Sequence, residues 1–281
     1  MKILIIGGGF CGSYCAKKLE KNFDVTLIDP KEYFEFTPSI PHVICDIEHR
    51  DKIRVAHKDY LKNTKLILGN VNEFNKDYVK VGKDVINYDY LVLSSGSTYK
   101  SPFKSNVVTV VSRSEDLLEY HNDVFKAQHI LIIGGGLVGV EMAAELLTCT
   151  NKKVTLIDRG DSLLRRNPMK AREYAKNFLL KKGCELIFND NVVKFGKNNF
   201  LTEKGKKLTA DFAFICTGIV PNKINKTKTN KEGYIVVDEF LRVSDNVFSG
   251  GDVADLIEER TAQNARRHGK VICKNISRNF C

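Results

Sequence analysis

The sequence lacks the short motifs that mark several classes of protein. None of its eight cysteines forms a C-x-x-C pair, so it predicts neither a zinc site nor a thioredoxin-like redox pair. No apolar run approaches the length of a membrane span, and the stretch 3–6 is too short for a signal-peptide core. Several cysteines lie within apolar patterns, where a free thiol acts as a small hydrophobic group. This usage favours a reducing, intracellular and cytoplasmic setting.

A dense basic segment is also absent, although the net charge is +10. Lysines and arginines are scattered without interleaved aromatic residues, so no nucleic-acid partner is expected. A positive surface suits anionic small molecules, and any membrane contact would be peripheral. With 281 residues, 43% of them hydrophobic, the chain has the composition of a globular protein of two modest domains.

An internal repeat organises the sequence. Residues 3–9 and 130–136 both read ILIIGGG, and each is followed by a helical pattern and the strand VTLID, at 25–29 and 154–158. Each copy ends in an apolar strand and a glycine turn, DYLVLSSGS and DFAFICTGI. We therefore expect an α/β protein built from two Rossmann-like, three-layer dinucleotide-binding domains.

Each copy carries G-x-G-x-x-G between its first strand and its first helix. The first glycine allows a tight turn, the second lets a pyrophosphate approach the backbone, and the third lets helix and strand pack closely. An aspartate ends the second strand, where it can accept hydrogen bonds from ribose hydroxyls. These residues are Gly7, Gly9, Gly12 and Asp29 in the first copy and Gly134, Gly136, Gly139 and Asp158 in the second. The Asp158 carboxylate favours NADH, while the adjacent Arg159 leaves NADPH open.

This layout resembles the pyridine nucleotide–disulfide oxidoreductase superfamily, whose flavoproteins bind two dinucleotides. The strand and Gly-Asp turn NVFSGGDVA at 246–254 is similar to their second FAD segment. Residues 34–53, 158–190 and 261–270 resemble type II NADH dehydrogenases and apoptosis-inducing-factor-like reductases. The resemblance implies that the first copy binds FAD and the second binds NADH or NADPH.

The same resemblance implies domain boundaries and site residues. The FAD-binding domain would comprise residues 1–112 and 222–281, with the NAD(P)H-binding domain, residues 113–221, inserted into it. The catalytic candidates are Glu141, beside the nicotinamide, and Gln263, at the flavin edge; a first-turn Glu is also stabilised by the helix dipole alone. Beyond the glycines and aspartates, the implied cofactor-binding residues are Phe10, Cys11, Pro38, Val71, Ser95, Gly96, Gly218, Gly251, Asp252 and Gln263.

The implied reaction is hydride transfer from NADH to FAD, followed by electron transfer to a quinone or a similar diffusible acceptor. Two departures from the resembling proteins leave the identity of the electron acceptor, homodimer formation and membrane attachment open. Arg267 replaces the second Gln of the A-Q-x-A-x-Q pattern, and the C-terminal domain that follows in the resembling proteins has no counterpart here. Two alternatives remain: a disulfide or persulfide reductase using Cys45, and a flavin-bearing redox sensor without rapid turnover.

Overall fold

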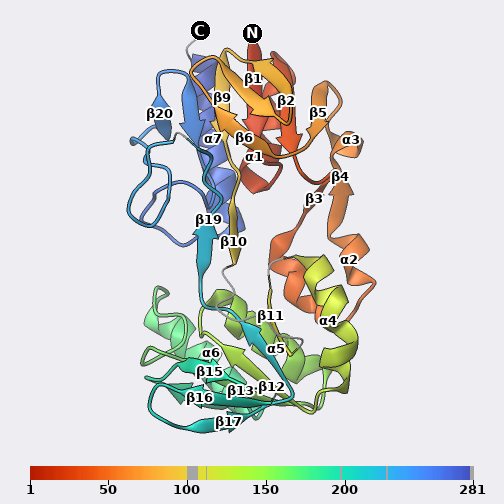
Figure 1. Cartoon of the computed structure of the whole chain (residues 1–281), viewed down its shortest axis with the longest axis vertical. Helices are drawn as coiled ribbons and strands as arrows, with labels where there is room; N and C mark the ends of the chain where they lie inside the picture. Colours follow the sequence, from red (N-terminus) through yellow and green to blue (C-terminus); the bar gives the residue numbers. More distant parts are fainter. Residues whose placement is uncertain (100–106, 112, 197, 226, 279–281) are drawn as a thin grey trace. The chain divides into compact units, whose positions relative to one another are not determined.

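The computed structural model describes residues 1–99, 107–111, 113–196, 198–225 and 227–278. The chain divides into two compact units (Figure 1). The first comprises Met1–Phe36, Arg54–Thr98 and Val220–Cys281, and the second comprises Thr37–Ile53 and Tyr99–Ile219. The chain passes between them along β10 (Ser97–Tyr99) and β19 (Ile219–Pro221), which pair as a two-stranded sheet.

The first unit is built on a sheet of order β20-β21-β9-β1-β2-β5. Its parallel strands are β1 (Lys2–Ile6), β2 (Asp24–Asp29), β5 (Thr64–Leu68), β9 (Tyr90–Leu93) and β21 (Val247–Ser249), and β20 (Arg242–Ser244) pairs antiparallel at one edge. One face is covered by helices α1 (Phe10–Leu19) and α7 (Ala262–Arg278), and the other by the antiparallel strands β6 (Val71–Phe74), β7 (Tyr78–Val81) and β8 (Asp84–Asn87).

Side-chain alternation along the central strand explains this layering. Ile3 and Ile5 belong to the apolar cluster that contains residues of α1 and α7, whereas Leu4 and Ile6 belong to the cluster that contains Val79 of β7. Successive residues of a strand point to opposite faces, so an uninterrupted apolar strand is buried on both sides.

The second unit repeats this architecture with a parallel sheet of order β11-β18-β12-β13-β14. The strands are β11 (Val108–Val110), β12 (His129–Ile133), β13 (Lys153–Asp158), β14 (Glu185–Phe188) and β18 (Phe212–Ile215). Helices α4 (Ser114–Lys126), α5 (Leu137–Cys149) and α6 (Met169–Lys181) pack into one apolar cluster, and the antiparallel strands β15 (Val192–Phe195), β16 (Asn199–Thr202) and β17 (Lys207–Thr209) form the other. The expectation of two Rossmann-like, three-layer domains is confirmed.

The segment 37–53 differs from the sequence-based domain assignment. It lies between β3 (Tyr33–Glu35) and β4 (Arg54–Ala56) and forms the 3-10 helix η1 (Thr37–Ile44) and α2 (His49–Lys52); α3 (His57–Tyr60) follows β4. Ile40, Val43, Ile44 and Ile53 join the apolar core of the second unit. The segment therefore groups with the second unit rather than with the proposed FAD domain, and the unit's other bounds lie at 99 and 219. The expected boundary at residue 112 lies outside the described residues.

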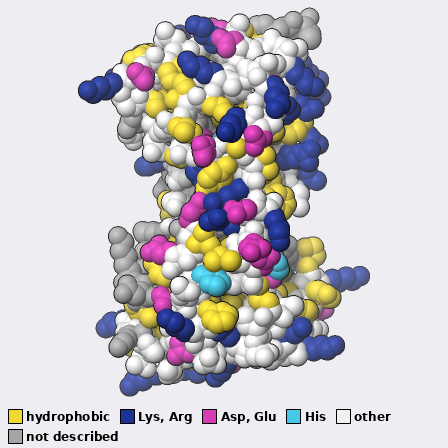
Figure 2. All heavy atoms as spheres, turned by 90° about the vertical axis from the view of Figure 1, so that its right-hand side faces the viewer, with side chains coloured by type: hydrophobic (Ala, Val, Ile, Leu, Met, Phe, Trp, Pro, Cys, Tyr) yellow, Lys and Arg dark blue, Asp and Glu magenta, His cyan; other side chains and the backbone are white. Residues whose placement is uncertain are grey.

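Two surface properties bear on partners. Within the described part of the chain, none of the helices combines the length and the apolar character needed to cross a bilayer. On the face drawn in Figure 2, Lys and Arg side chains occur over both units, with acidic, apolar and neutral side chains among them. This distribution fits the scattered basic residues of the sequence.

Candidate dinucleotide-binding sites

The three glycines of the first loop have different structural surroundings. Gly7 has φ +95°, and a Cβ there would lie 2.2 Å from the Ser94 carbonyl oxygen. A Cβ at Gly12 would lie 1.9 Å from the Gly7 carbonyl oxygen, so helix and strand could not approach as they do. A Cβ at Gly9, by contrast, would meet no atom of the described residues within 4 Å. The turn and the packing thus account for Gly7 and Gly12, whereas Gly9 borders open space.

The second loop repeats this pattern. Gly134 has φ +114°, and its Cβ would lie 2.6 Å from the Cys216 carbonyl oxygen. A Cβ added at Gly139 would lie 1.9 Å from the Gly134 carbonyl oxygen. A Cβ added at Gly136 would meet none of the described atoms within 4 Å. The middle glycine is again the one that the protein's own packing does not require.

Both open spaces lie at the start of a helix. Gly9 and Gly136 are the N-cap residues of α1 and α5, and neither supplies a side-chain cap to the first-turn N–H groups. The first turn of each helix also carries no acidic residue. Free N–H groups and the positive end of the helix dipole favour an anion, so each loop has the chemistry and the room for a phosphate.

The strand-end aspartates brace these loops. Asp29 Oδ2 accepts a hydrogen bond from the Gly8 N–H at 2.5 Å, and Asp158 Oδ2 accepts one from the Gly135 N–H at 2.6 Å. The other oxygen of each carboxylate accepts the backbone N–H two residues further along the chain. Loop bracing is therefore a structural reason for both aspartates, which the sequence pattern did not reveal. Their contact with ribose hydroxyls stays a prediction.

A buried histidine beside the first loop was missed by the sequence reasoning. His57 is 1% exposed, and its Nδ1 lies 2.7 Å from the Tyr60 hydroxyl. The Tyr60 hydroxyl donates a hydrogen bond to Ser13 Oγ. The Ser13 hydroxyl donates in turn to the Gly8 carbonyl oxygen. His57 Nε2 is buried and has no hydrogen-bond partner among the described residues, and a Cβ at Gly8 would lie 2.6 Å from it. Burial lowers the pKa of the His57 ring and raises that of Tyr60 to about 12. A neutral imidazole thus presents an unused polar atom next to the loop.

The Gly-Asp turn forms a shallow pocket in the first unit. The pocket is lined by Gly251, Asp252, Ala254, Leu256, Glu258, Arg260, Thr261, Asn264, Ala265 and His268. Asp252 Oδ2 accepts the Ser97 hydroxyl at 2.9 Å. The Gly251 N–H donates to His268 Nδ1 at 3.0 Å, and His268 Nε2 lies 2.7 Å from Glu258 Oε1. Side chains from β10 and α7 therefore hold this turn in place.

Cys11 connects this turn to the first loop. A Cβ at Gly250 would lie 2.9 Å from Cys11 Sγ, and one at Gly251 would lie 3.5 Å from Cys11 Cβ. The two segments that the resemblance assigns to FAD are thus adjacent. The buried Cys11 side chain serves to pack them together.

The remaining residues that the resemblance implies for cofactor binding are spread over several elements. Ser95 donates its hydroxyl to a backbone carbonyl oxygen at 2.5 Å, Val71 begins β6, and Gly96 and Gly218 adopt φ +70° and +96° in turns after β9 and β18. Pro38 lies in η1, in the second unit. Their contacts with cofactor stay predictions.

Two further residues flank the pocket and the first loop. Gln263 is exposed on α7 and does not line the pocket, whereas the next residue, Asn264, does. Phe10 packs edge-on against Phe34 and Phe36, with ring centroids 5.0 Å and 5.6 Å apart. Phe10 therefore anchors the β3 segment beside the first loop.

Glu141 lies one turn into α5, after the second loop. Its side chain is exposed, yet surrounding protein raises the pKa of its carboxyl, and the like charge of Glu145 adds to the effect. Since the side chain still reaches solvent, the upward shift is limited. Its role beside the nicotinamide stays a prediction.

The cysteines among the described residues comprise one bonded pair and five free thiols. Cys45 and Cys149 form a disulfide between the end of η1 and the end of α5. Cys45, which the alternative disulfide or persulfide reductase would use, is therefore bonded to a second cysteine. Cys11 and Cys15 are buried, and hydrogen bonds to Cys11 and Cys273, with burial, raise the pKa of Cys15 well above its ordinary value. A buried thiol held neutral is a poor nucleophile.

Two units, each with a G-x-G-x-x-G loop that opens onto an uncapped helix N-terminus, are the architecture of a two-dinucleotide protein. Comparison with known proteins is consistent with this. The family described as "Pyridine nucleotide-disulphide oxidoreductase" matches residues 1–269, and the chain belongs to this family. Members of the family use FAD and NAD(P)H.

Individual relatives match most of the chain. It is 30% identical over 313 residues to apoptosis-inducing factor homolog A of Dictyostelium discoideum, covering 98% of this chain and 76% of the relative. The fold is similar to that of a NAD-dependent persulfide reductase from A. fulgidus, with a TM-score of 0.87 and 23% identity over 99% of this chain. It is also similar to NDH2 from Plasmodium falciparum in complex with NADH, with a TM-score of 0.80 and 21% identity over 90% of this chain. The chain spans 59% and 64% of these two structures.

Proposed function

We propose that the chain is an FAD-dependent NADH oxidoreductase that passes electrons to a quinone or a similar diffusible acceptor. The observation that carries this proposal is the pair of middle glycines, Gly9 and Gly136, each beside open space at an uncapped helix. FAD would bind the first unit and NADH the second. Membership of the pyridine nucleotide-disulphide oxidoreductase family supports this class of activity.

The residues of the first unit fit FAD. The Gly9 space and the α1 N-terminus suit its pyrophosphate, and the buried, unpartnered His57 Nε2 beside Gly8 offers an acceptor to a hydroxyl or amine of the ligand. Asp252, held by Ser97, faces the adjacent pocket. When bound, FAD supplies the ring that accepts hydride, and the protein supplies binding and orientation.

In the second unit, the residues bind and orient the nicotinamide cofactor. The open space beside Gly136 would take the pyrophosphate, and the Asp158 carboxylate that braces the loop would repel a 2′-phosphate. Glu141, with its raised pKa, holds or passes a proton beside this site. NADH is therefore the proposed donor, in preference to NADPH.

The test begins with the purified full chain. Flavin released on denaturation is quantified, and the flavin spectrum is then followed anaerobically during separate additions of NADH and NADPH. Reoxidation by ubiquinone analogues, by disulfides and by persulfides identifies the acceptor class. Rapid bleaching by NADH and multiple turnover with a quinone support the proposal. A protein without flavin, or one that is reduced but turns over no quinone, rejects it; the second outcome favours a redox sensor.

A second candidate is a disulfide or persulfide reductase. It is favoured by the Cys45–Cys149 disulfide, which supplies a pair of sulfur atoms that NADH-derived electrons could reduce, and by the fold of the persulfide reductase. Under this candidate, Cys45→Ser abolishes NADH-dependent turnover of persulfides. Under the leading proposal, Cys45→Ser leaves quinone turnover intact.

A further inference from the structure

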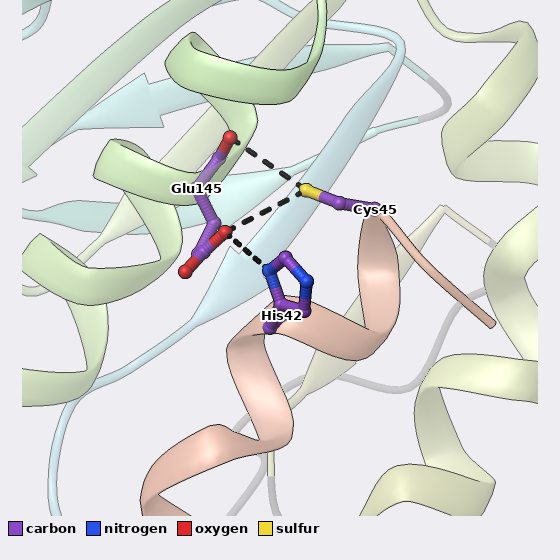
Figure 3. A group of neighbouring side chains, drawn as sticks. All are labelled: His42, Cys45 and Glu145. Atoms are coloured by element: carbon purple, nitrogen blue, oxygen red, sulfur yellow. Dashed lines mark hydrogen bonds and ion pairs between the residues drawn. The ribbon is translucent and has the colours of Figure 1, made fainter. Parts of the chain in front are cut away.

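Four side chains with metal-binding atoms meet between two elements of the second unit. His42 lies on η1, Cys45 directly follows η1, and Glu145 lies on α5 (Figure 3). Cys149 is the last residue of α5. His42 Nδ1 is 2.9 Å from Glu145 Oε2, and Cys45 Sγ is 3.9 Å from the same oxygen. These three atoms lie within 4.8 Å of one another, and Cys149 Sγ is bonded to Cys45 Sγ. The ligand atoms of His42, Cys45 and Glu145 therefore lie close enough to share one ion, and Cys149 Sγ lies one bond beyond Cys45 Sγ.

Local structure and packing fix this arrangement. The Cys45 N–H donates to the His42 carbonyl oxygen at 2.9 Å, which places these two residues on one turn at the end of η1. Glu145 and Cys149 are four apart in α5 and so lie on one side of that helix. Val43 and Ile44 of η1 share a buried apolar cluster with Met142 and Leu146 of α5. The cluster packs the two elements against each other, so their contact does not rest on the disulfide alone.

The oxidised pair is a poor ligand, because a disulfide sulfur carries neither charge nor proton to exchange. Reduction changes the donor set to two thiolates, one imidazole and one carboxylate, which is the tetrahedral combination that Zn²⁺ favours. We propose that the reduced chain binds one Zn²⁺ through His42, Cys45, Glu145 and Cys149. A small-molecule disulfide releases the ion by thiol–disulfide exchange: it accepts two electrons from the two thiolates and two protons from solvent, leaves as two thiols, and the Cys45–Cys149 bond forms again.

The chemistry balances with a thiol reductant. A dithiol transfers two electrons and two protons to the Cys45–Cys149 disulfide and becomes a disulfide itself, leaving two protein thiols. Zn²⁺ then displaces the two thiol protons to solvent as its bonds to sulfur form. His42 and Glu145 have side chains 42% and 35% exposed, so a metal ion and a reductant can both reach the site from solvent.

Small movements complete the coordination sphere. With Zn–S bonds of about 2.3 Å and Zn–N and Zn–O bonds of about 2.0 Å, neighbouring ligand atoms around zinc stand about 3.3–3.8 Å apart. The two sulfurs separate when their bond is reduced, and the contact between His42 and Glu145 opens by less than about 1 Å. The Cα atoms of the cysteines, 5.9 Å apart, can remain in place.

A second group of donors shares one of these residues. His42, Asp46 and His49 also have ligand atoms within 4.8 Å of one another. This group contains no sulfur, so its affinity for zinc would not depend on the redox state of the chain. Zinc binding that depends on the redox state of the chain therefore identifies the group with the two cysteines, and binding that does not identifies the group of His42, Asp46 and His49.

The experiment titrates Zn²⁺ into the full chain, reduced and then freed of reductant, in competition with a chromogenic chelator. We expect one equivalent of tight binding by the reduced chain and none by the same protein after oxidation. Cys45→Ser and Cys149→Ser each weaken binding by on the order of 100-fold, and His42→Ala by at least about tenfold. Cys273→Ser and His121→Ala, at positions in α7 and α4 outside the cluster, are the matched controls and bind as the parent does.

Cobalt gives an independent readout. Co²⁺ added to the reduced chain should produce a thiolate charge-transfer band in a difference spectrum against the flavin, and the band should be absent in Cys45→Ser. The inference is overturned if the reduced parent takes up no equivalent of Zn²⁺, or if oxidised and reduced chains bind it equally. Intact binding in Cys45→Ser with loss in His49→Ala would overturn it as well. None of these measurements uses oxidoreductase activity, so their outcome is independent of the proposed function.

Discussion

Asp158 and Gly135 are joined by a hydrogen bond of 2.6 Å, in which the backbone N–H of the glycine loop donates to a carboxylate 23 residues later in the chain. Asp29 and Gly8 repeat the arrangement in the first unit. The carboxylate thus fixes the loop, and under the proposed function it would also meet the ribose of the nicotinamide cofactor. Changes at Asp158 should therefore alter both stability and the choice of nicotinamide cofactor.

The first prediction concerns that choice. Asp158→Asn keeps an acceptor for a backbone N–H but removes the charge that repels a 2′-phosphate. We expect the ratio of kcat/KM for NADPH to that for NADH to rise about tenfold, equivalent to about 1.4 kcal/mol. Steady-state kinetics with each donor measure it, and Asp161→Asn, at an exposed position nearby, is the control. An unchanged ratio would show that Asp158 only braces the loop.

The second prediction distinguishes a glycine needed for ligand binding from a glycine needed for packing within the first loop. Gly9→Ala places a methyl group in open space, so the free energy of unfolding should fall by less than about 1 kcal/mol while flavin content drops sharply. Gly12→Ala forces a carbon against the Gly7 carbonyl oxygen and should lower stability by about 1–3 kcal/mol or more. Denaturation of the flavin-free chains and extraction of flavin measure the two effects. Full flavin content in Gly9→Ala would contradict the assignment.

The features that the sequence predicted are those set by local pattern. The glycine spacing, the apolar strands and the strand-end aspartates recur within about 25 residues of one another, and strand and loop geometry follow from such short segments. The packing of residues 37–53 against α5 could not be predicted this way, because Cys45 and Glu145 are 100 positions apart. His57 carries no motif at all, since its role depends on Ser13 and Tyr60 meeting it across the fold.

The third prediction uses the buried ring of His57. Its pKa lies below the ordinary value of 6.5 in the folded chain, so the folded state resists protonation that the unfolded state accepts. The contribution to stability is therefore complete above pH 6.5 and is lost as the pH falls from there toward the folded pKa. His57→Gln should show a smaller loss of stability between pH 7.5 and 5.5 than the parent, by denaturant unfolding at about 0.5-unit steps. His121→Gln should keep the parental loss, and an equal loss in His57→Gln would refute the prediction.

The fourth prediction concerns the disulfide between η1 and α5. Its cysteines are 104 residues apart, and closing a loop of about 100 residues stabilises a protein by about 4.7 kcal/mol in the chain-entropy description. Cys45→Ser, Cys149→Ser and the double variant should therefore lose the same amount, about 4–5 kcal/mol, relative to the oxidised parent. Under reducing conditions with a chelator, all three should match the parent within about 1 kcal/mol, because no crosslink is then left to remove. Denaturant unfolding with and without reductant checks this. If the double variant lost the sum of the two single losses, the cysteines would be acting separately and not as a pair.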